Sequence, residues 1–420
     1  MRRASTVAFA ALIVLAGAAP AQNDVSTSGV FHRLSDRVIR IQVTEGSSAT
    51  KVVVGSGFFV DDKGRLVTNY HVVSEVVYHP ERYVIRLGDG TNPADTAHIL
   101  ALDVVSDLAV LQAAPKPRPH FTLGRVSVRQ GERLYAMGDP LDLGLSIIEG
   151  TYNGLLQHTL YPRLHFTGSL NHGMSGGPTI TAQGQVVGIN VSTEGEEVSF
   201  LVPVERAIEL VAKATAPTAP KTRHLLDEIR QQITTYQDVY LRNVLTDTTQ
   251  SVDLGPFRVA TQPAPFFHCW GDTPSSTTRP FERVDYRCST DDELYVAQDQ
   301  SSGLVQLTHV LLSTTKLGAT RFYSLYASTF KRDNTPSGTA EHVTSWRCTT
   351  RNLAENQVTM RAVLCVRAYR LLPGLYDGVV KVAVLGKQDA GLVSTLTLSG
   401  VSSANIATLS NRFLGRFAWR

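Results

Sequence analysis

Short apolar segments recur from residue 30 to residue 204, and this pattern constrains the fold more than any other feature of the sequence. Some segments alternate apolar and polar residues, as in RVIRIQVT, whereas others, such as LAVLQAA, are continuously apolar. Gly, Asp, Pro and Asn separate them, which is typical of β-strands joined by tight turns. Three prolines in APKPRPHF, at 114–121, indicate an extended connector. The pattern predicts an all-β domain with two halves of similar size, as two packed β-barrels require.

The composition changes after residue 213. ATAPTAP is typical of a linker, which we assign to 214–222. HLLDEIRQQITTYQDVYLRNVL, at 224–245, then places apolar residues on one helical face, and SSANIATLSNRFLGRF, at 402–417, repeats that spacing. Strand-like runs such as GLVQLTHVLL lie between them. Residues 223–420 are therefore predicted to form an α/β (α+β) region that begins with a helix, continues as β-rich structure and matches no fold we recognise.

The N-terminus has the features of a signal peptide. Arg2 and Arg3 precede a short apolar run, and Ala19 and Ala21 occupy the small-residue positions that a signal peptidase reads. The run is too short, and a proline follows it too closely, to favour a membrane span. We expect residues 1–21 to be removed and the mature chain to be periplasmic or secreted, with no membrane span left. An uncleaved membrane anchor is the alternative.

The cysteines agree with export. They number four and all lie in the second half of the chain: Cys269, Cys288, Cys348 and Cys365. Their separations of 19, 60 and 17 residues include no C-x-x-C pair, which argues against a zinc site. An even number in an exported chain indicates two disulfides, whose connectivity stays open. YRCST and WRCTT, around Cys288 and Cys348, form a faint repeat that would place one cysteine in each bridge.

The charge balance does not indicate a nucleic-acid-binding protein. Removing Arg2 and Arg3 from the 40 basic residues leaves 38 against 37 acidic residues. Electrostatic binding of nucleic acid normally requires a basic patch or a strongly basic domain. We therefore expect polypeptide partners and no nucleic acid, and the sequence gives no oligomeric state.

Three residues are candidates for nucleophilic catalysis. NHGMSGGPTI, at 171–180, surrounds Ser175 with glycines, which suits either a nucleophile or an ordinary turn serine. GRLVTNYHVV places His71 at the end of a strand-like run, and VVSDLAVL places Asp107 just before an apolar strand. Asp103, in the same turn, is the competing acid. The order His, Asp, Ser is that of trypsin-like enzymes and not that of subtilisins or α/β-hydrolases.

These residue types form one chemical unit. Serine is a weak nucleophile until an adjacent base takes its proton, and an imidazole suits that task near neutral pH. A carboxylate on the far ring nitrogen fixes the tautomer and stabilises the imidazolium. The charge that develops on the scissile carbonyl oxygen needs preorganised donors. The backbone N–H groups of Gly173 and Ser175 are the candidates, since glycine at 173 permits a backbone geometry that a side chain hinders.

Four segments resemble the HtrA/Deg group of trypsin-like serine proteases. They are GSGFFVDDKGRLVTNYHVV, DVVSDLAVLQ, AMGDPLDLGLSIIEGTYNGLL and NHGMSGGPTITAQGQVVGIN, at 55–73, 103–112, 136–156 and 171–190. The resemblance spans residues 52–211, under half of the chain. It implies a trypsin-like domain of two β-barrels over residues 30–213, with the connector near 114–122.

The resemblance also implies roles for individual residues. His71 becomes the base, Asp107 its orienting acid and Ser175 the nucleophile, with the oxyanion donors at Gly173 and Ser175. GINVS resembles the strand that pairs with the substrate backbone by β-augmentation. The implied substrate-binding residues are Ser169, Gly188, Asn190, Val191 and Ser192. The family's preference implies small or medium apolar side chains in the first pocket.

The sequence departs from the family in several places. Met174 stands where the family usually has asparagine, and it cannot form the ion pair that activates pancreatic-type zymogens. His172 replaces a common proline, and Thr167 replaces an acid. No convincing PDZ pattern follows Pro220, so properties that depend on PDZ domains do not transfer.

The sequence therefore predicts an exported serine endopeptidase that works through an acyl-enzyme on Ser175, without a metal or organic cofactor. By resemblance, its substrates are unfolded or misfolded exported proteins. One alternative is a trypsin-fold binding module that has lost its chemistry. The other places the main function in the C-terminal region, where Trp270, Tyr286 and Trp346 near the cysteines would bind a ligand.

Overall fold

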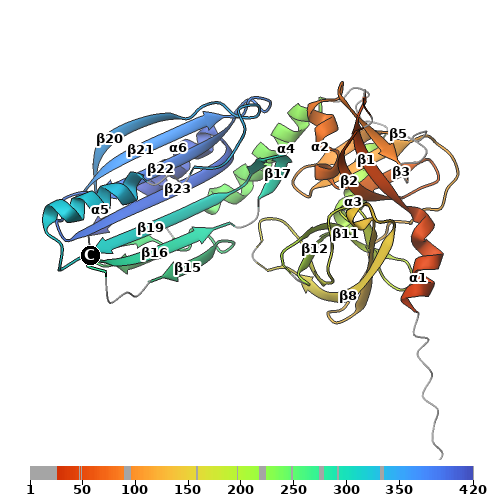
Figure 1. Ribbon diagram of the computed structural model, residues 1–420, viewed down its shortest axis with the longest axis horizontal. Coiled ribbons are helices and arrows are strands. Elements are labelled where there is room, and N and C mark those ends of the chain that lie inside the picture. Colours follow the sequence, from red (N-terminus) through yellow and green to blue (C-terminus); the bar gives the residue numbers. More distant parts are fainter. Residues whose placement is uncertain are drawn as a thin grey trace, which may run out of the picture.

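The computed structural model describes part of the chain, residues 26–419 except 47, 49, 89–95, 158, 196, 217–223, 247–248, 274–278, 291–292 and 332–334. The predicted signal peptide at 1–21 lies outside the described residues, as does most of the linker predicted at 214–222. The chain forms two β-barrels followed by a large sheet with its helices (Figure 1).

The first barrel closes in the antiparallel order β1-β2-β3-β6-β5-β4. Its strands are β1 (Val38–Glu45), β2 (Lys51–Phe59), β3 (Arg65–Thr68), β4 (Tyr83–Leu87), β5 (Thr96–Asp103) and β6 (Leu108–Ala113). In β4, Tyr83, Ile85 and Leu87 are buried and alternate with half-buried residues, because successive strand side chains point to opposite faces. Helix α2 (Tyr70–Tyr78) follows β3 and packs its buried side chains onto this barrel.

The second barrel closes in the order β10-β11-β12-β9-β8-β7. Its strands are β7 (Arg133–Gly138), β8 (Ser146–Leu155), β9 (Leu164–Thr167), β10 (Pro178–Ile180), β11 (Val186–Thr193) and β12 (Ser199–Pro203). Helices α1 (Thr27–Leu34) and α3 (Val204–Thr215) pack against the apolar core that both barrels share. The two closed barrels agree with the all-β domain predicted from the alternating segments.

Beyond the barrels, seven of the described strands form one antiparallel sheet, called here the C-terminal sheet, in the order β15-β16-β19-β23-β22-β21-β20. Its strands are β15 (His268–Asp272), β16 (Glu282–Ser289), β19 (Val305–Ser313), β20 (Arg347–Glu355), β21 (Val358–Ala368), β22 (Leu375–Val384) and β23 (Ala390–Ser402). Strands β13 (Ser251–Leu254), β14 (Phe257–Ala260) and β24 (Ala418–Trp419) form a smaller sheet. Strands β17 (Leu294–Ala297) and β18 (Gln300–Ser302) form a hairpin.

Helices cover both faces of the C-terminal sheet. They are α4 (Leu225–Tyr240), α5 (Ala319–Lys331) and α6 (Ser403–Leu414). Leu311 and Leu312 are neighbours on β19 and so point to opposite faces. Leu311 belongs to the core that includes α6, whereas Leu312 packs with Phe322 of α5. The C-terminal region is therefore rich in antiparallel sheet, with described helices on both of its faces.

The two predicted disulfides are confirmed, and the structure supplies their connectivity. Cys269 pairs with Cys288, and Cys348 pairs with Cys365. Each bridge joins directly opposed residues of neighbouring strands, β15 with β16 and β20 with β21. These strand pairs lie at the two opposite edges of the C-terminal sheet. The faint repeat around Cys288 and Cys348 therefore supplies one cysteine to each bridge.

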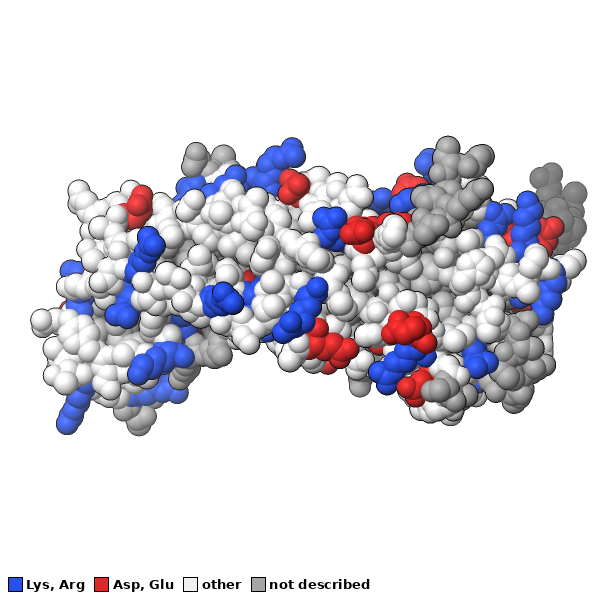
Figure 2. Space-filling model, turned by 90° about the horizontal axis from the view of Figure 1, so that it is seen from above, with Lys and Arg blue, Asp and Glu red and all other residues white. Residues whose placement is uncertain are grey.

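The C-terminal region is docked onto the first barrel. Helix α4 extends from the barrel along the C-terminal sheet, and β17 lies beside α2 (Figure 1). Ile229 and Ile233 of α4 and Val296 of β17 are fully buried in one apolar core with residues of the first barrel. On the face shown in Figure 2, Lys and Arg prevail over the C-terminal region, whereas acidic and basic side chains mix over the barrels. None of the described helices has the length and apolar character needed to cross a membrane.

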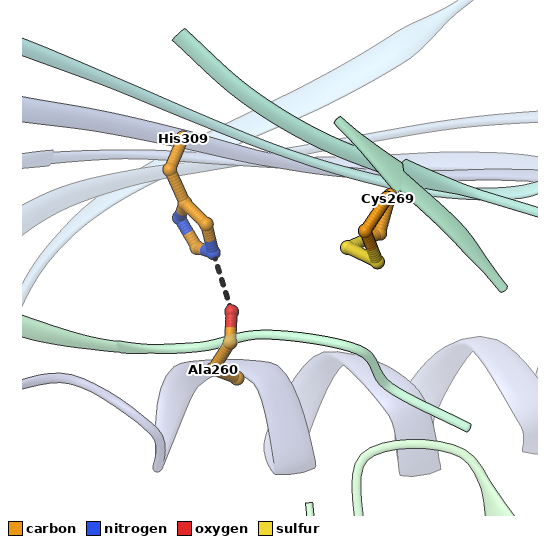
Figure 3. Close-up of a disulfide and its surroundings, with 4 residues drawn as sticks. Ala260, Cys269 and His309 are labelled. Atoms are coloured by element: carbon orange, nitrogen blue, oxygen red, sulfur yellow. Dashed lines mark hydrogen bonds between the residues drawn. A yellow bond between two sulfur atoms is a disulfide. The ribbon is translucent and has the colours of Figure 1, made fainter. Parts of the chain in front are cut away.

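His309 lies inside the C-terminal core, on the face that carries the Cys269–Cys288 bridge (Figure 3). Its Nε2 lies 2.8 Å from the carbonyl oxygen of Ala260, and its Nδ1 lies 2.7 Å from the Ser394 hydroxyl. A carbonyl only accepts, so Nε2 carries the proton and Nδ1 accepts from Ser394. Burial lowers the pKa of His309 to about 4.

We expect His309 to make the fold sensitive to acid. Because the folded pKa of His309, about 4, lies below its ordinary 6.5, the unfolded chain binds more protons between these values. Stability is therefore lost as the pH falls from 6.5 toward 4, by about 3 kcal/mol from this residue. Denaturant unfolding at several pH values measures the slope. His309→Gln keeps a donor for the Ala260 carbonyl but does not titrate, so its free energy of unfolding should depend less on pH between 6.5 and 4. The same pH dependence in the variant and the wild type would contradict the role given to His309.

Candidate active site

His71 is the second residue of α2, which corrects one detail of the sequence interpretation. GRLVTNYHVV was expected to be a strand that ends at His71, but β3 ends at Thr68 and the helix begins at Tyr70. Asn69 takes the N-cap position with an extended backbone, and asparagine is among the residues favoured there. The Asn69 side chain makes no capping hydrogen bond, however. Asp107 instead accepts the main-chain N–H groups of Tyr70 and His71, the first two residues of α2, a contact that the apolar pattern does not reveal.

The carboxylate of Asp107 holds His71 at two points. Its Oδ2 lies 2.6 Å from the Nδ1 of the imidazole, and its Oδ1 accepts the main-chain N–H of His71 at 2.9 Å. A carboxylate only accepts, so Nδ1 carries the proton and the far nitrogen, Nε2, is left as the basic atom. The arrangement fixes both the ring orientation and the tautomer of His71.

Asp107 is presented by a turn between β5 and β6. It has a left-handed backbone, with a φ of 54°, a conformation that aspartate adopts more readily than most residues. Its carbonyl accepts from the Asn69 side chain at 2.8 Å and from the Tyr70 amide at 3.1 Å. Asp103, the competing acid, instead accepts the amide of Ser106 at 3.0 Å and so closes the turn. The structure places Asp107, and not Asp103, on His71.

The environment of His71 shifts its pKa. Burial alone lowers the pKa, but the negative charge of Asp107 and its hydrogen bond together outweigh burial, so the pKa of His71 lies above its ordinary value. The imidazolium is therefore more stable here than in water, as a general base in this position requires.

Ser175 lies in a tight loop, residues 171–177, called here the Ser175 loop. Gly173 and Gly176 have φ values of 94° and 85°, which disfavour any side chain. A Cβ at Gly173 would lie 2.3 Å from the Asp139 carbonyl, and one at Gly176 would lie 2.3 Å from the Ser56 carbonyl. The glycines around Ser175 are therefore required by close backbone contacts on both sides.

Ser56, on β2 of the first barrel, clamps the Ser175 loop. Its hydroxyl donates to the Gly173 carbonyl at 2.7 Å, and its amide donates to the Ser175 carbonyl at 2.8 Å. The Thr68 hydroxyl donates to the Ser56 carbonyl at 2.7 Å, which links the clamp to the segment just before α2. The sequence interpretation missed Ser56, although its GSGFF context lies within the resembling segments.

The amides of Gly173 and Ser175 point to a site for a negative charge. Within the described part of the chain, neither amide donates a hydrogen bond to another group of the protein. Met174 and Gly176, by contrast, donate to the carbonyls of Asn171 and Asn190. Both amides are therefore available as donors, as the predicted oxyanion site requires.

The Ser175 hydroxyl is half-buried and lies 3.5 Å from the carbonyl oxygen of Val191. Among the described residues, no hydrogen bond joins Ser175 to His71. Catalytic hydrogen bonds are commonly long without substrate and tighten when it binds. The structure thus pairs His71 with Asp107 and clamps the Ser175 loop to the strand and segment that precede α2.

The five predicted substrate-binding residues lie in different environments. Ser169 is exposed and Ser192 is half-exposed. Gly188 is buried between β10 and β12, where a Cβ would lie 2.9 Å from the Val202 carbonyl. Val191 lies at an irregularity in the pairing of β11 with β12, with its carbonyl next to Ser175.

Asn190 supports the Ser175 loop from the second barrel. Its Nδ2 donates to the Met137 carbonyl at 3.0 Å and to the Met174 carbonyl at 3.2 Å. Its main-chain carbonyl accepts the Gly176 amide at 2.9 Å. Asn190 is fully buried, so its side chain serves the fold of the loop. Met174 is also fully buried and packs in the core of the second barrel.

The aromatic residues proposed as a ligand-binding surface do not gather in one place. Trp270 and Tyr286 lie on β15 and β16, whereas Trp346 directly precedes β20 at the opposite edge of the C-terminal sheet. Tyr286 stacks on His309, and Trp346 lies under the guanidinium of Arg367.

Comparison with known proteins gives matches over the barrels. Residues 55–189 match the family model described as a trypsin-like peptidase domain. The mitochondrial serine protease HTRA2 of Bos taurus is 35% identical over 169 residues, which cover 37% of this chain and 35% of that protein. Serine protease HTRA1B of Danio rerio is 28% identical over 214 residues, which cover 47% of this chain and 44% of that protein. The chain thus spans between a third and a half of the length of these curated relatives.

Two solved structures are similar at lower identity. They are the serine endoprotease from Yersinia pestis and Deg5, each 24% identical with a TM-score of 0.39 and each covering 45% of this chain. The matches cover 66% and 93% of those chains, respectively.

Proposed function

From the match of residues 55–189 to a trypsin-like peptidase domain and the similarity to HtrA serine proteases, we propose that the whole protein is an exported serine endopeptidase of HtrA/Deg-like, trypsin-like type. The observation that carries the proposal is the two-point hold of Asp107 on His71, through the ring Nδ1 and the main-chain amide. That contact leaves Nε2 of His71 as the basic nitrogen and fixes its direction.

In the proposed reaction, Nε2 of His71 takes the proton of the Ser175 hydroxyl as Oγ attacks the scissile carbonyl carbon. The carbonyl oxygen becomes an oxyanion, which the amides of Gly173 and Ser175 stabilise. The imidazolium then gives its proton to the leaving amine, the peptide bond breaks, and an ester to Ser175 remains. Water, activated by His71, hydrolyses that ester and restores the serine.

The proposed substrates are unfolded or misfolded exported polypeptides, bound beside β11 in an extended form. Similarity to the serine proteases HTRA2 and HTRA1B supports polypeptide substrates, and the unfolded or misfolded class is proposed from the resemblance to the HtrA/Deg group. Small or medium apolar side chains are proposed for the pocket near Ser169, Val191 and Ser192. Export is proposed from the signal-peptide features of residues 1–21.

Fluorophosphonate labelling of the purified mature protein tests the proposal directly, with Ser175→Ala beside it and peptide mapping of the adduct. We expect an adduct on Ser175 that is absent from the variant, because the reagent reacts only with an activated serine. A folded protein that stays unlabelled, both alone and with an unfolded protein substrate present, would favour the alternative of a binding module without chemistry.

We expect kcat/KM for a peptide substrate to rise with pH through a titration above pH 6.5. The general base works only when it is neutral, and Asp107 raises the pKa of His71 above its ordinary value of 6.5. A pH–rate profile with a substrate that does not titrate in this range measures the ascending limb. An ascending limb centred well below pH 6.5 would contradict the assignment of His71 as the base.

A further inference from the structure

Tyr295, on β17 of the C-terminal region, contacts the imidazole of His71. The two rings meet edge to face, with centroids 5.8 Å apart and an interplanar angle of 63°. The Tyr295 hydroxyl lies 3.2 Å from the hydroxyl of Ser74, which is on α2 one turn after His71. His71 is therefore in contact with Asp107 through Nδ1 and with Tyr295 through its ring.

The strand that carries Tyr295 is fixed to α2. Tyr70, which directly precedes His71, is fully buried, and its hydroxyl donates to the Val296 carbonyl at 2.6 Å. The rings of Tyr70 and Tyr295 also meet, with centroids 6.1 Å apart. Val296 is itself fully buried in the core shared with the first barrel. Hydrogen bond, ring contact and apolar burial together hold Tyr295 in place.

The C-terminal region also forms hydrogen bonds with the turn that contains Asp107. Gln232 of α4 accepts the Val104 amide at 2.8 Å through Oε1 and donates to the Leu102 carbonyl at 2.9 Å through Nε2. Leu102 and Val104 lie where β5 passes into the turn that ends at Asp107. One side-chain amide with both of its ends bonded fixes the direction of that turn.

We propose that the C-terminal region positions the His71–Asp107 pair, with Tyr295 acting on the imidazole and Gln232 acting on the turn that carries the carboxylate. This rests on the proposed function, which makes the pair a catalytic unit. The Ser175 loop has supports of its own in the barrels, from Ser56 and from Asn190. The C-terminal region therefore positions His71 and Asp107, which transfer the proton. The barrels themselves position the Ser175 loop, which carries the oxyanion donors.

Variants of Tyr295 test the first contact by steady-state kinetics on a peptide substrate. We expect Tyr295→Ala to lower kcat about tenfold with little change in KM, because the imidazole loses its ring contact while the substrate site stays intact. Tyr295→Phe keeps the ring and should restore most of kcat. Tyr236→Phe is the control. It removes a tyrosine hydroxyl of the C-terminal region that donates to the Leu160 carbonyl of the barrels, away from His71. It should keep wild-type kcat.

Variants of Gln232 test the second contact. Gln232→Ala should loosen the turn, move Asp107 away from His71 and so lower the pKa of His71, whose elevation depends on that carboxylate. Gln231→Ala, an exposed glutamine on the same helix, is the control. Tyr295→Ala should instead raise the pKa of His71, because burial is the largest influence on it and acts downward. Opposite shifts in the two variants would not arise from general unfolding.

The other titratable groups around the imidazole do not obscure the change in the pKa of His71. Burial raises the pKa of Tyr70 far above its ordinary value and that of Tyr295 to about 12, so both stay neutral near pH 7. Glu75 of α2 and Asp299 of the hairpin act on the Tyr295 hydroxyl. Asp107 is the charged group that acts on His71.

NMR titration of the His71 imidazole in a Ser175→Ala background separates this inference from the proposed function, because it needs no activity. Labelling of the wild type at Ser175 tests the function, and the titration tests the positioning contacts. Wild-type kcat and an unshifted His71 titration in Tyr295→Ala would overturn the inference. So would an equal loss of kcat in Tyr236→Phe, which would indicate general loosening between the regions. Thermal melts of each variant report that it is folded.

Discussion

Ser175→Ala is expected to lose at least about a thousandfold in kcat/KM while the protein stays folded. The substitution removes Oγ, the atom that forms the acyl-enzyme, and leaves the oxyanion donors of Gly173 and Ser175 in place. The backbone of the Ser175 loop should not move, because Ser56 binds it through main-chain carbonyls. Hydrolysis of a peptide substrate, with thermal melting alongside, measures the two expectations together.

Ser127→Ala is the control for this prediction. Ser127 is an exposed serine in the segment between the barrels, and its substitution should leave kcat/KM unchanged. Residual activity in Ser175→Ala reflects water attack assisted by the oxyanion donors. Wild-type peptidase activity in a pure Ser175→Ala sample would remove Ser175 from the mechanism and with it the acyl-enzyme.

The barrels could be predicted from the sequence because their strands alternate locally and glycines mark their turns. The alternation in YVIRL, for example, depends only on successive residues of one strand that point to opposite faces. The order of the C-terminal sheet could not be predicted in this way. It depends on which strands pair across long separations, as when β19 pairs with β23. The pairing of the four cysteines stayed open because spacing alone does not show which strands are adjacent, although each bridge joins two consecutive strands.

Some residues of the candidate site could likewise be predicted from the sequence, and others could not. Chain order and the resemblance indicated His71, Asp107 and Ser175, and the turn geometry adds the contact that distinguishes the two acids: Asp107 lies on His71, whereas Asp103 accepts the Ser106 amide. No sequence pattern indicated Tyr295, because its contact with Ser74 joins residues that are 221 positions apart in the chain. A residue that supports an active site from another region carries no motif of its own. Such supports become visible only once the regions are docked.

Asp107→Asn is expected to lower kcat by about ten-thousandfold. An asparagine that keeps the main-chain contact to His71 presents its amide nitrogen to the ring, which then takes the wrong tautomer and loses its basic Nε2. The pKa of His71 should also fall below its ordinary value, because the burial that lowers it is no longer opposed by a negative charge. Kinetics and NMR titration of the imidazole measure the two effects independently.

Asp103→Asn is the matched substitution, four residues away in the same turn. Asp103 accepts one hydrogen bond from the Ser106 amide, and an asparagine oxygen accepts that bond equally well. We therefore expect kcat to stay within about threefold of wild type. If Asp103→Asn proved the more damaging of the two, Asp103 would be the orienting acid, and the contact between Asp107 and His71 would belong to a resting arrangement that rearranges before catalysis.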